Sequence, residues 1–425
     1  MKYLLTLVLL CVIGLPACYQ DDSNKYTSNT GGLVFTKTEV SNGILFQWEP
    51  STISNFTEYV ITKHSNSTAT LTSLSELNRL SPDNIVARVK NRNITSSKDS
   101  TSTASAYYRL YLVYGSHFTA SDELFQLSNY YTLGSQFFSQ LLLDHRKGDL
   151  YLFQHNLVEI IDLNRMLQKD LISTTRSISS YSMSLGYDQN GNTEVYSSNG
   201  DKILVFNGEK LDVIDTICNN PKKKFIYNTV TDQNSNIFYT EADSVAKYDP
   251  LTKKISKFGS NGSFQEAIQV SRDGKTIITG TGFAFMYQYL LDQNNTLISV
   301  KRSPNTIEFS NRNFILANTE TTIVAGSSGA IYNKDFVWQK NIANEIVGYL
   351  ESIFDPEDKF IYSIGRSTNF VFKFEHKPGY KFIEKIKIRI NPTRIFAYNG
   401  HIFAIGNLVD PNTGISSVLL ERVKL

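Results

Sequence analysis

Few side chains in this chain of 425 residues stand at spacings that suit catalysis. Glu241 and Asp243 form a close acidic pair, two residues apart, and paired carboxylates serve general acid and base chemistry. The same spacing also fits the ordinary polarity of a turn. The six histidines occur singly in different segments, which favours isolated surface or turn positions over a shared site: His64, His117, His145, His155, His376 and His401.

Sequence motifs of known catalytic and metal sites are missing. The chain contains no His-Glu-x-x-His, no cysteine pair at metal-ligand spacing, no Gly-x-Ser-x-Gly and no glycine loop for phosphate. The net charge of +2 gives no general attraction to nucleic acid. We therefore predict a protein that is not an enzyme, with no catalytic residues, no metal and no cofactor.

Polar loop residues suit recognition better than reaction. Pro221–Lys224 is the one concentrated run of charge, and it fits either a solvated loop or contact with an anionic partner. Arg366 is the strongest single candidate because a guanidinium brings several fixed donors. The predicted binding residues are His155, Asn156, Asn199, Lys223, Glu241, Asp243, Phe283, Ser328, Arg366 and Asn407.

A repeating turn positions these loops, and it is clearest within Val270–Ile278. An apolar strand runs into Asp273-Gly274, the chain reverses, and a second apolar strand leaves. Glycine accepts positive φ without steric cost, and aspartate can bond its own backbone. The turn recurs at intervals of about 37 to 45 residues, a period typical of propeller blades. The turn residues are Asp144, Asp188, Asp232, Asp273, Asn318, Asp355 and Asn399.

Seven such turns predict an all-β fold with a seven-bladed β-propeller over residues 129–425, each blade holding four antiparallel strands. Ser271–Thr276 matches the motif Ser-x-Asp-Gly-Lys-Thr, and Tyr248–Thr252 matches Tyr-Asp-Pro-x-Thr. In these motifs the chain resembles the YVTN-like branch of seven-bladed propellers. That resemblance implies the fold and little about function, because the motifs are turn chemistry. The binding residues above are expected on the rim formed by the loops after each second strand and the connections between blades.

The last blade lacks one strand in the sequence. Only three strand-like segments follow Asn391, and an unclosed ring would expose a sheet edge. We therefore expect a segment within Tyr130–Phe138 to supply the fourth strand.

Residues 33–128 show short strands without the propeller period, which indicates a two-sheet sandwich. Trp48 and Pro50, together with the segment Tyr108–Val113, resemble the fibronectin type III family. That family implies a core position for Trp48. Residues 91–105 are almost wholly polar and are expected to form an exposed loop.

The first residues of the chain have the features of a targeting signal. Lys2 precedes an apolar run from Leu4 to Leu15, which has the length of a signal-peptide core. The run ends in Leu15-Pro16-Ala17-Cys18, which resembles a bacterial lipobox. That resemblance implies a signal peptide over residues 1–17, acyl chains on Cys18 and a flexible tether over 18–32. The alternative is an ordinary secretory signal with an incidental cysteine.

The acidic pair Asp21-Asp22, close to Cys18, resembles the export signal of surface lipoproteins in the Bacteroidota. This resemblance implies a lipid-anchored outer-membrane protein exposed at the cell surface. It also implies that the propeller binds a polar ligand or a protein partner, as part of TonB-dependent transport or of a secretion or assembly complex. The alternatives are a carbohydrate-active enzyme built on a propeller and a surface adhesin.

Overall fold

The computed structural model describes residues 33–40, 43–65, 70–100, 105–134, 138–174, 182–218, 225–241, 244–260, 267–280, 285–304, 314–319, 322–325, 328–377, 379–409 and 416–423. Within them the chain forms two compact units. The first unit holds residues up to 102 together with Ala106–Gln126, and the second holds Thr103–Ser105 with Leu127–Leu425. No helix in the described part of the chain is long and apolar enough to cross a membrane.

The first unit is built from two antiparallel sheets. One has the order β1-β2-β5, and the other has the order β4-β3-β6-β7, with β8 also paired to β6. A short helix, α1 (Leu74–Arg79), is capped by Ser73, and β4 follows a 3-10 turn at Pro82–Asn84. The strands are β1 (Phe35–Val40), β2 (Gly43–Trp48), β3 (Phe56–His64), β4 (Ile85–Val89), β5 (Ser96–Asp99), β6 (Ala106–Tyr114), β7 (His117–Ala120) and β8 (Leu124–Gln126).

Both sheets contribute to one apolar core, so the unit is a sandwich. Phe46 and Trp48 from β2 pack with Tyr59 from β3 and Tyr108 from β6. The predicted core position of Trp48 is confirmed, since only 5% of this residue is exposed.

The expectation of an exposed loop over residues 91–105 is wrong for part of that segment. Strand β5 lies within it and pairs with Ile44–Gln47 of β2. Asp99 is buried, and its carboxylate accepts hydrogen bonds from Lys63 and Tyr108 at 2.9 and 2.8 Å. A strand whose side chains are mostly polar shows no hydrophobic alternation, so the sequence pattern does not reveal it. Backbone pairing with β2 holds β5 in the sheet.

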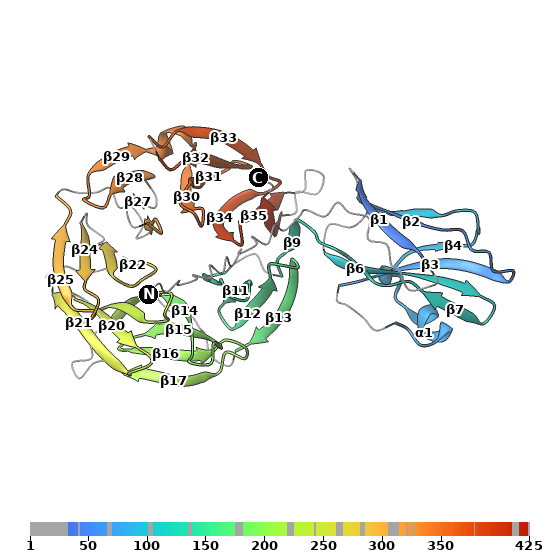
Figure 1. Cartoon of the computed structure of the whole chain (residues 1–425), viewed down its shortest axis with the longest axis horizontal. Helices are drawn as coiled ribbons and strands as arrows, with labels where there is room; N and C mark the ends of the chain where they lie inside the picture. The colour runs from blue at the N-terminus through green and yellow to red at the C-terminus, as the bar shows by residue number, and fades with distance from the viewer. Residues whose placement is uncertain are drawn as a thin grey trace, which may run out of the picture. The chain divides into compact units, whose positions relative to one another are not determined.

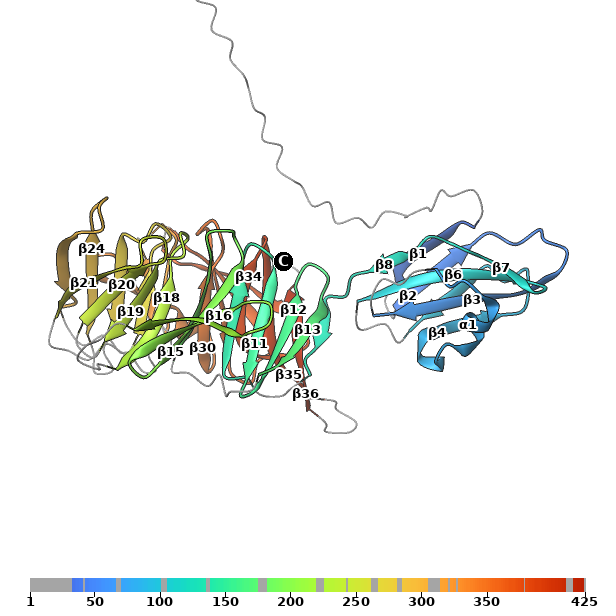
Figure 2. The same cartoon turned by 90° about the horizontal axis from the view of Figure 1, so that it is seen from below.

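The second unit is a β-propeller. Its described residues contain seven four-stranded antiparallel sheets, here called blades 1 to 7 in chain order. Figure 1 shows the blades arranged around a common centre, with labelled first strands such as β14 and β22 on the inner side, and Figure 2 shows their strands crossing between two faces. Blades 1 to 3 consist of β10 (Gln140–Asp144), β11 (Asp149–Gln154), β12 (Leu157–Asp162), β13 (Leu167–Ser173); β14 (Met183–Tyr187), β15 (Thr193–Asn199), β16 (Lys202–Asn207), β17 (Val213–Cys218); β18 (Ile226–Thr231), β19 (Ile237–Glu241), β20 (Ser244–Asp249) and β21 (Lys254–Ser260).

The remaining blades repeat this plan. Blades 4 to 6 consist of β22 (Ala267–Val270), β23 (Thr276–Gly280), β24 (Met286–Leu291), β25 (Leu297–Arg302); β26 (Phe314–Leu316), β27 (Thr322–Ala325), β28 (Ala330–Asn333), β29 (Trp338–Asn341); β30 (Tyr349–Phe354), β31 (Phe360–Gly365), β32 (Phe370–Glu375) and β33 (Phe382–Lys387). Blade 7 has β34 (Asn391–Tyr398), β35 (His401–Val409) and β36 (Ser416–Val423), with β9 (Tyr130–Thr132) as its fourth strand.

The repeated turns lie where the sequence predicts them, each between the first and second strand of a blade. At the turn of blade 4, Gly274 has φ +73°, in the left-handed region that glycine tolerates best. Ser271 and Asp273 bond within this turn, since the Asp273 carboxylate accepts from the Ser271 hydroxyl at 2.6 Å and from the Lys275 amide at 2.9 Å. The first-to-second-strand turns therefore share one end of the ring, which we call the turn face.

The predicted closing strand is confirmed. In β9, Tyr130–Thr132 pairs antiparallel with Leu419–Glu421 of β36. The Leu133 amide donates to the Val418 carbonyl at 2.9 Å just beyond this pairing. The Tyr131 hydroxyl donates to Glu159 of blade 1 at 2.7 Å. The first propeller strand in the chain thus completes the last blade and also contacts the first.

Apolar cores lie between the blades rather than within them. Each of seven buried clusters joins residues from two consecutive blades, as Val195 of blade 2 packs with Tyr151 of blade 1. The cluster that contains Leu420 and Leu150 joins blade 7 to blade 1. Because this cluster connects the last blade to the first, the packing forms a closed ring.

Candidate binding site

A cavity of about 1970 Å³ forms the channel at the centre of the ring. First-strand residues from all seven blades line it, from Gln140 in blade 1 to Phe396 in blade 7. Several turn-face residues line its wall, such as Arg146 and Asn399. The closed ring therefore creates a space that no single blade contains.

Amide side chains supply much of the polar lining. They combine donors and acceptors on one group and suit hydrogen-bonded recognition of polar molecules. Apolar side chains such as Leu185 and Phe314 separate them, as is common in ligand cavities. The lining amides are Gln140, Asn228, Gln233, Asn234, Gln269, Asn318 and Asn399.

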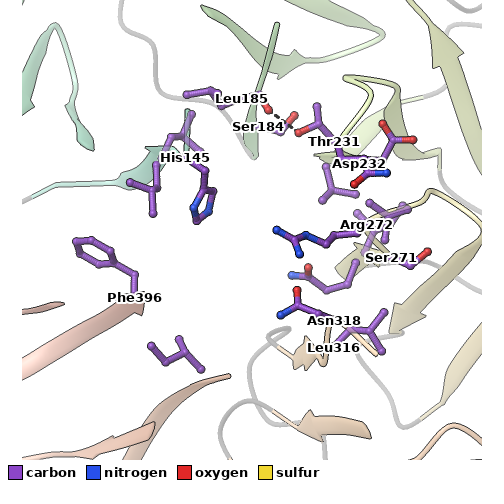
Figure 3. A pocket seen from close by; sticks show the side chains of 18 of the residues that line it. His145, Ser184, Leu185, Thr231, Asp232, Ser271, Arg272, Leu316, Asn318 and Phe396 are labelled. Carbon is purple, nitrogen blue, oxygen red and sulfur yellow. Dashed lines mark hydrogen bonds between the residues drawn. The ribbon is translucent and has the colours of Figure 1, made fainter. Parts of the chain in front are cut away.

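Two basic side chains face each other across the channel. Figure 3 shows His145, from the turn after β10, and Arg272, from the turn after β22, pointing into the open centre from opposite walls. Within the described residues the Arg272 guanidinium makes no hydrogen bond or ion pair. Its charge is therefore available to a ligand.

The surroundings of His145 disfavour its protonated form. Burial among the channel walls lowers its pKa below the ordinary 6.5, and the positive charge of Arg272 lowers it further, whereas Asp144 acts in the opposite direction. An anion bound between His145 and Arg272 would favour the protonated imidazole. His145 and Arg272 could then offer two positive charges to a negatively charged group.

Arg146 extends the basic wall and is held by its neighbours. Its guanidinium carbon lies 3.7 Å from the ring centre of Tyr187, a cation–π contact. The Tyr187 hydroxyl donates to the buried carboxylate of Asp144 at 2.7 Å. Asp144 thus positions Tyr187, which in turn orients Arg146 at the channel wall.

One carboxylate lines the channel among the described residues, and its oxygens are occupied. Asp232 accepts from the amides of Asn234 and Asn236, both at 2.9 Å, and from the Asn236 side chain at 2.7 Å. Burial raises the pKa of Asp232, while these hydrogen bonds lower it. Asp232 therefore serves the turn, and the unpaired charge in the channel is positive.

Those residues of the predicted binding rim that the structure describes do not line this channel. His155, Asn156 and Asn199 are exposed at the opposite end of their blades, and Ser328 is partly exposed. Lys223, Asp243, Phe283 and Cys18 lie outside the described residues.

The expectation that Glu241 belongs to a rim is wrong. Glu241 is 1% exposed, and its carboxylate accepts hydrogen bonds from Lys257 at 3.0 and 3.2 Å. A buried carboxylate requires a partner, and this one finds it on the fourth strand of its own blade. Glu241 is therefore not available as a ligand-binding or catalytic group.

Arg366 and Asn407, by contrast, are brought together. They line a second cavity of about 460 Å³ at the end of the ring opposite the turn face, between blades 6 and 7. Arg394 and Asn391 from the start of β34 complete its polar wall. The strongest candidate of the sequence analysis thus belongs to a pocket separate from the channel.

The sequence analysis does not single out His145, Arg146 and Arg272, which line the channel, although a signal for them exists. All three follow the first strand of a blade at the predicted turns, so the repeat itself places them on one face of the ring. The sequence analysis instead favours the loops after each second strand, which lie at the other end of the strands. Among the described residues, no group of three or more histidine, cysteine, aspartate or glutamate side chains is arranged to hold a metal ion.

No protein-family description and no curated protein matches this chain. Many solved structures are similar to it, including the following two. One is the β-propeller domain of Cps50 (Swd1) from Myceliophteria thermophila, with 12% identity, a TM-score of 0.46, and coverage of 68% of this chain and 97% of the other. The second is Kuenenia stuttgartiensis hydrazine synthase, with 11% identity, a TM-score of 0.45, and coverage of 68% and 98%. Similarity at this level says nothing about ligand or reaction, and the ring of blades rests on the strand pairing above.

Proposed function

We propose that this protein is a lipid-anchored recognition module of the bacterial outer membrane, and that its propeller channel binds a polar ligand carrying a negative charge. The observation that carries the proposal is the channel of about 1970 Å³ in which Arg272 has no protein partner among the described residues. An unpaired guanidinium is a strong donor to carboxylate and phosphate groups. The surrounding amides would fix the orientation of the rest of the ligand.

We propose that the channel binds its ligand and does not catalyse a reaction on it. The channel wall holds a partnered carboxylate at Asp232, and the acidic pair suggested by the sequence loses Glu241 to an internal ion pair. Acid and base catalysis by two carboxylates needs both groups to reach the substrate. A capture or accessory protein beside an outer-membrane transporter or assembly complex is the role that this binding surface supports best.

We infer that the first unit is a fibronectin type III-like spacer between the lipid anchor and the propeller. Its two sheets share one core, and Trp48 packs on Tyr59 with ring centres 5.3 Å apart. The buried charges are paired internally, as Lys63 is with Asp99. A module of this kind suits spacing or docking.

Citrate, a small tricarboxylate, is a suitable probe of the channel. We expect Arg272→Ala to weaken citrate binding about tenfold or more, because a charge-assisted contact contributes about 1.5–3 kcal/mol and 1.4 kcal/mol is tenfold. Isothermal titration calorimetry measures the change. Arg165→Ala removes an exposed arginine of blade 1 and serves as the control, and Arg366→Gln should also leave channel binding intact. Equal citrate affinity in the wild type and Arg272→Ala would contradict the proposal.

Lipid attachment is tested separately at Cys18. We expect Cys18→Ser to abolish incorporation of an alkyne-tagged palmitate and to move the protein from the detergent phase to the aqueous phase on detergent phase separation. The matched control is Cys218→Ser, which changes the other cysteine that follows the signal segment and should keep the label. Palmitate labelling that persists in Cys18→Ser would show that Cys18 is not the acylated residue.

A further inference from the structure

The pocket between blades 6 and 7 differs from the channel in size and position. It occupies about 460 Å³, compared with about 1970 Å³ for the channel. Its wall consists of the start of β30 and β34, the turn after β31, and the facing ends of β35 and β36. These strand ends lie at the end of the ring opposite the turn face. The pocket is therefore at the other end of the ring from the turn-face residues that line the channel.

Basic and neutral polar side chains make up the hydrophilic wall of this pocket. Arg366 and Arg394 supply two guanidinium groups from neighbouring blades, and both residues are exposed. The described residues give the Arg366 guanidinium no hydrogen bond or ion pair. Arg394 donates to the Thr393 carbonyl at 3.0 Å, which leaves most of its donors free. Among the residues that the structure describes, no carboxylate lines the pocket.

We propose that this pocket is a second binding site, for a tetrahedral oxyanion such as a sulfate or phosphate group, held between Arg366 and Arg394. A carboxylate offers two oxygens in one plane, which a single guanidinium can satisfy. A sulfate or phosphate offers oxygens in several directions and can accept from both guanidinium groups at once. The side chains of Asn391 and Asn407 add amide donors at the same wall. The pocket has room for one such group, free or attached to a larger molecule.

Glu351 lies beside this site and modulates it. Its carboxylate accepts from the Ile395 amide at 3.1 Å, one residue beyond Arg394. Burial raises the pKa of Glu351 to about 7, although the charge of Arg394 and the Ile395 amide act against the rise. Tyr349 is also a titratable neighbour of Glu351. Its phenol stays neutral because burial raises its pKa.

The protonation of Glu351 sets the charge available to an oxyanion. Below its pKa the carboxyl is neutral, and the positive charge of Arg394 is uncompensated. Above its pKa the carboxylate attracts the Arg394 guanidinium and repels a second anion. The site should therefore hold an oxyanion more tightly at about pH 6 than at about pH 8.

Equilibrium dialysis with radiolabelled sulfate tests the proposal. Sulfate keeps one charge state across this pH range, so any pH dependence belongs to the protein. The titration is made in the Arg272→Ala background, which removes the channel cation, so the outcome is independent of the channel proposal. We expect one sulfate per chain, and about tenfold or greater weakening in both Arg366→Gln and Arg394→Gln. Arg165→Gln is the matched control.

Glu351→Gln keeps an acceptor for the Ile395 amide and removes the titration. We expect sulfate affinity to fall between about pH 6 and about pH 8 in the parent, and to stay level in Glu351→Gln. Circular dichroism of each variant confirms the fold before dialysis. Sulfate binding that neither arginine variant weakens would overturn the site, and affinity that is the same at both pH values in the parent would overturn the role of Glu351.

Discussion

Asp144→Ala is expected to lower the free energy of unfolding by about 4 kcal/mol, because it removes the acceptor of a buried network that joins blade 1 to blade 2. Asp144 is fully buried, and its carboxylate accepts from the Thr193 hydroxyl at 2.6 Å and the Tyr187 hydroxyl at 2.7 Å. It also accepts from the amides of Arg146 and Lys147. Alanine would leave the buried Thr193 hydroxyl without this partner. Urea denaturation measures the loss.

The neighbouring blade provides a matched control. Asp188 occupies the same turn position in blade 2 and also accepts several hydrogen bonds, from the Asn190 and Asn192 amides and the Asn192 side chain, each at 2.8 Å. These bonds are exposed and stay within one turn, so water can replace them. Asp188→Ala should cost about 1 kcal/mol. Equal losses in both variants would show that the contact between blades contributes nothing beyond the turn itself.

The effect of Asp144 should depend on pH. Burial raises its pKa, but the hydrogen bonds from Thr193, Tyr187 and the two amides outweigh burial, so the pKa lies below the ordinary 3.8. A carboxylate whose pKa is lowered by folding stabilises the protein above its unfolded pKa and loses that effect as pH falls through the folded value. The stability difference between wild type and Asp144→Ala should therefore shrink below about pH 3.8.

The second large effect is expected at the closing strand. Leu133→Pro should destabilise the propeller by about 4 kcal/mol, because it removes the amide that donates to Val418 and also the apolar side chain. Leu133 is 7% exposed and belongs to the core between blades 7 and 1. Loss of β9 from its blade exposes the edge of β36. Urea denaturation and hydrogen exchange of the β36 amides measure the change.

Two variants separate the causes of this loss. Leu133→Ala removes the side chain and keeps the amide, and should cost about 2–3 kcal/mol. Thr132→Pro places proline at an exposed residue of the same outermost strand, where a missing amide is tolerated best. If Leu133→Pro is no worse than Leu133→Ala, the backbone bond to Val418 does not contribute to closing the ring.

The turn chemistry explains why so much of the propeller could be predicted. Residues such as Asp273 and Gly274 act within a few positions of the chain, so their pattern is visible without knowledge of distant contacts. Their period then counts the blades. The missing strand of blade 7 was predictable as well, because a ring that lacks one strand must find it elsewhere in the chain.

The polar segment that contains β5 shows where this reasoning fails. Ser96–Asp99 has no hydrophobic alternation, and its place in the sheet comes from pairing with β2 about fifty residues earlier. The prediction that Glu241 lies on a binding rim is wrong for a related reason. A carboxylate near a loop reads as exposed, but Lys257 on β21 lies within hydrogen-bond distance and allows it to be buried.

The sequence by itself determined the all-β class, the number of blades, the position of each turn and the strand that closes the ring, because these features depend on local backbone preferences repeated at a regular interval. Only the tertiary structure decided which side chains share a cavity. His145 and Arg272 are 127 residues apart in the sequence numbering, and they face each other because the successive blades 1 to 4 curve around one axis. Which charges lack a partner among the described residues, as at Arg272 and Arg366, depends on neighbours from other blades, and a local pattern carries no information about them.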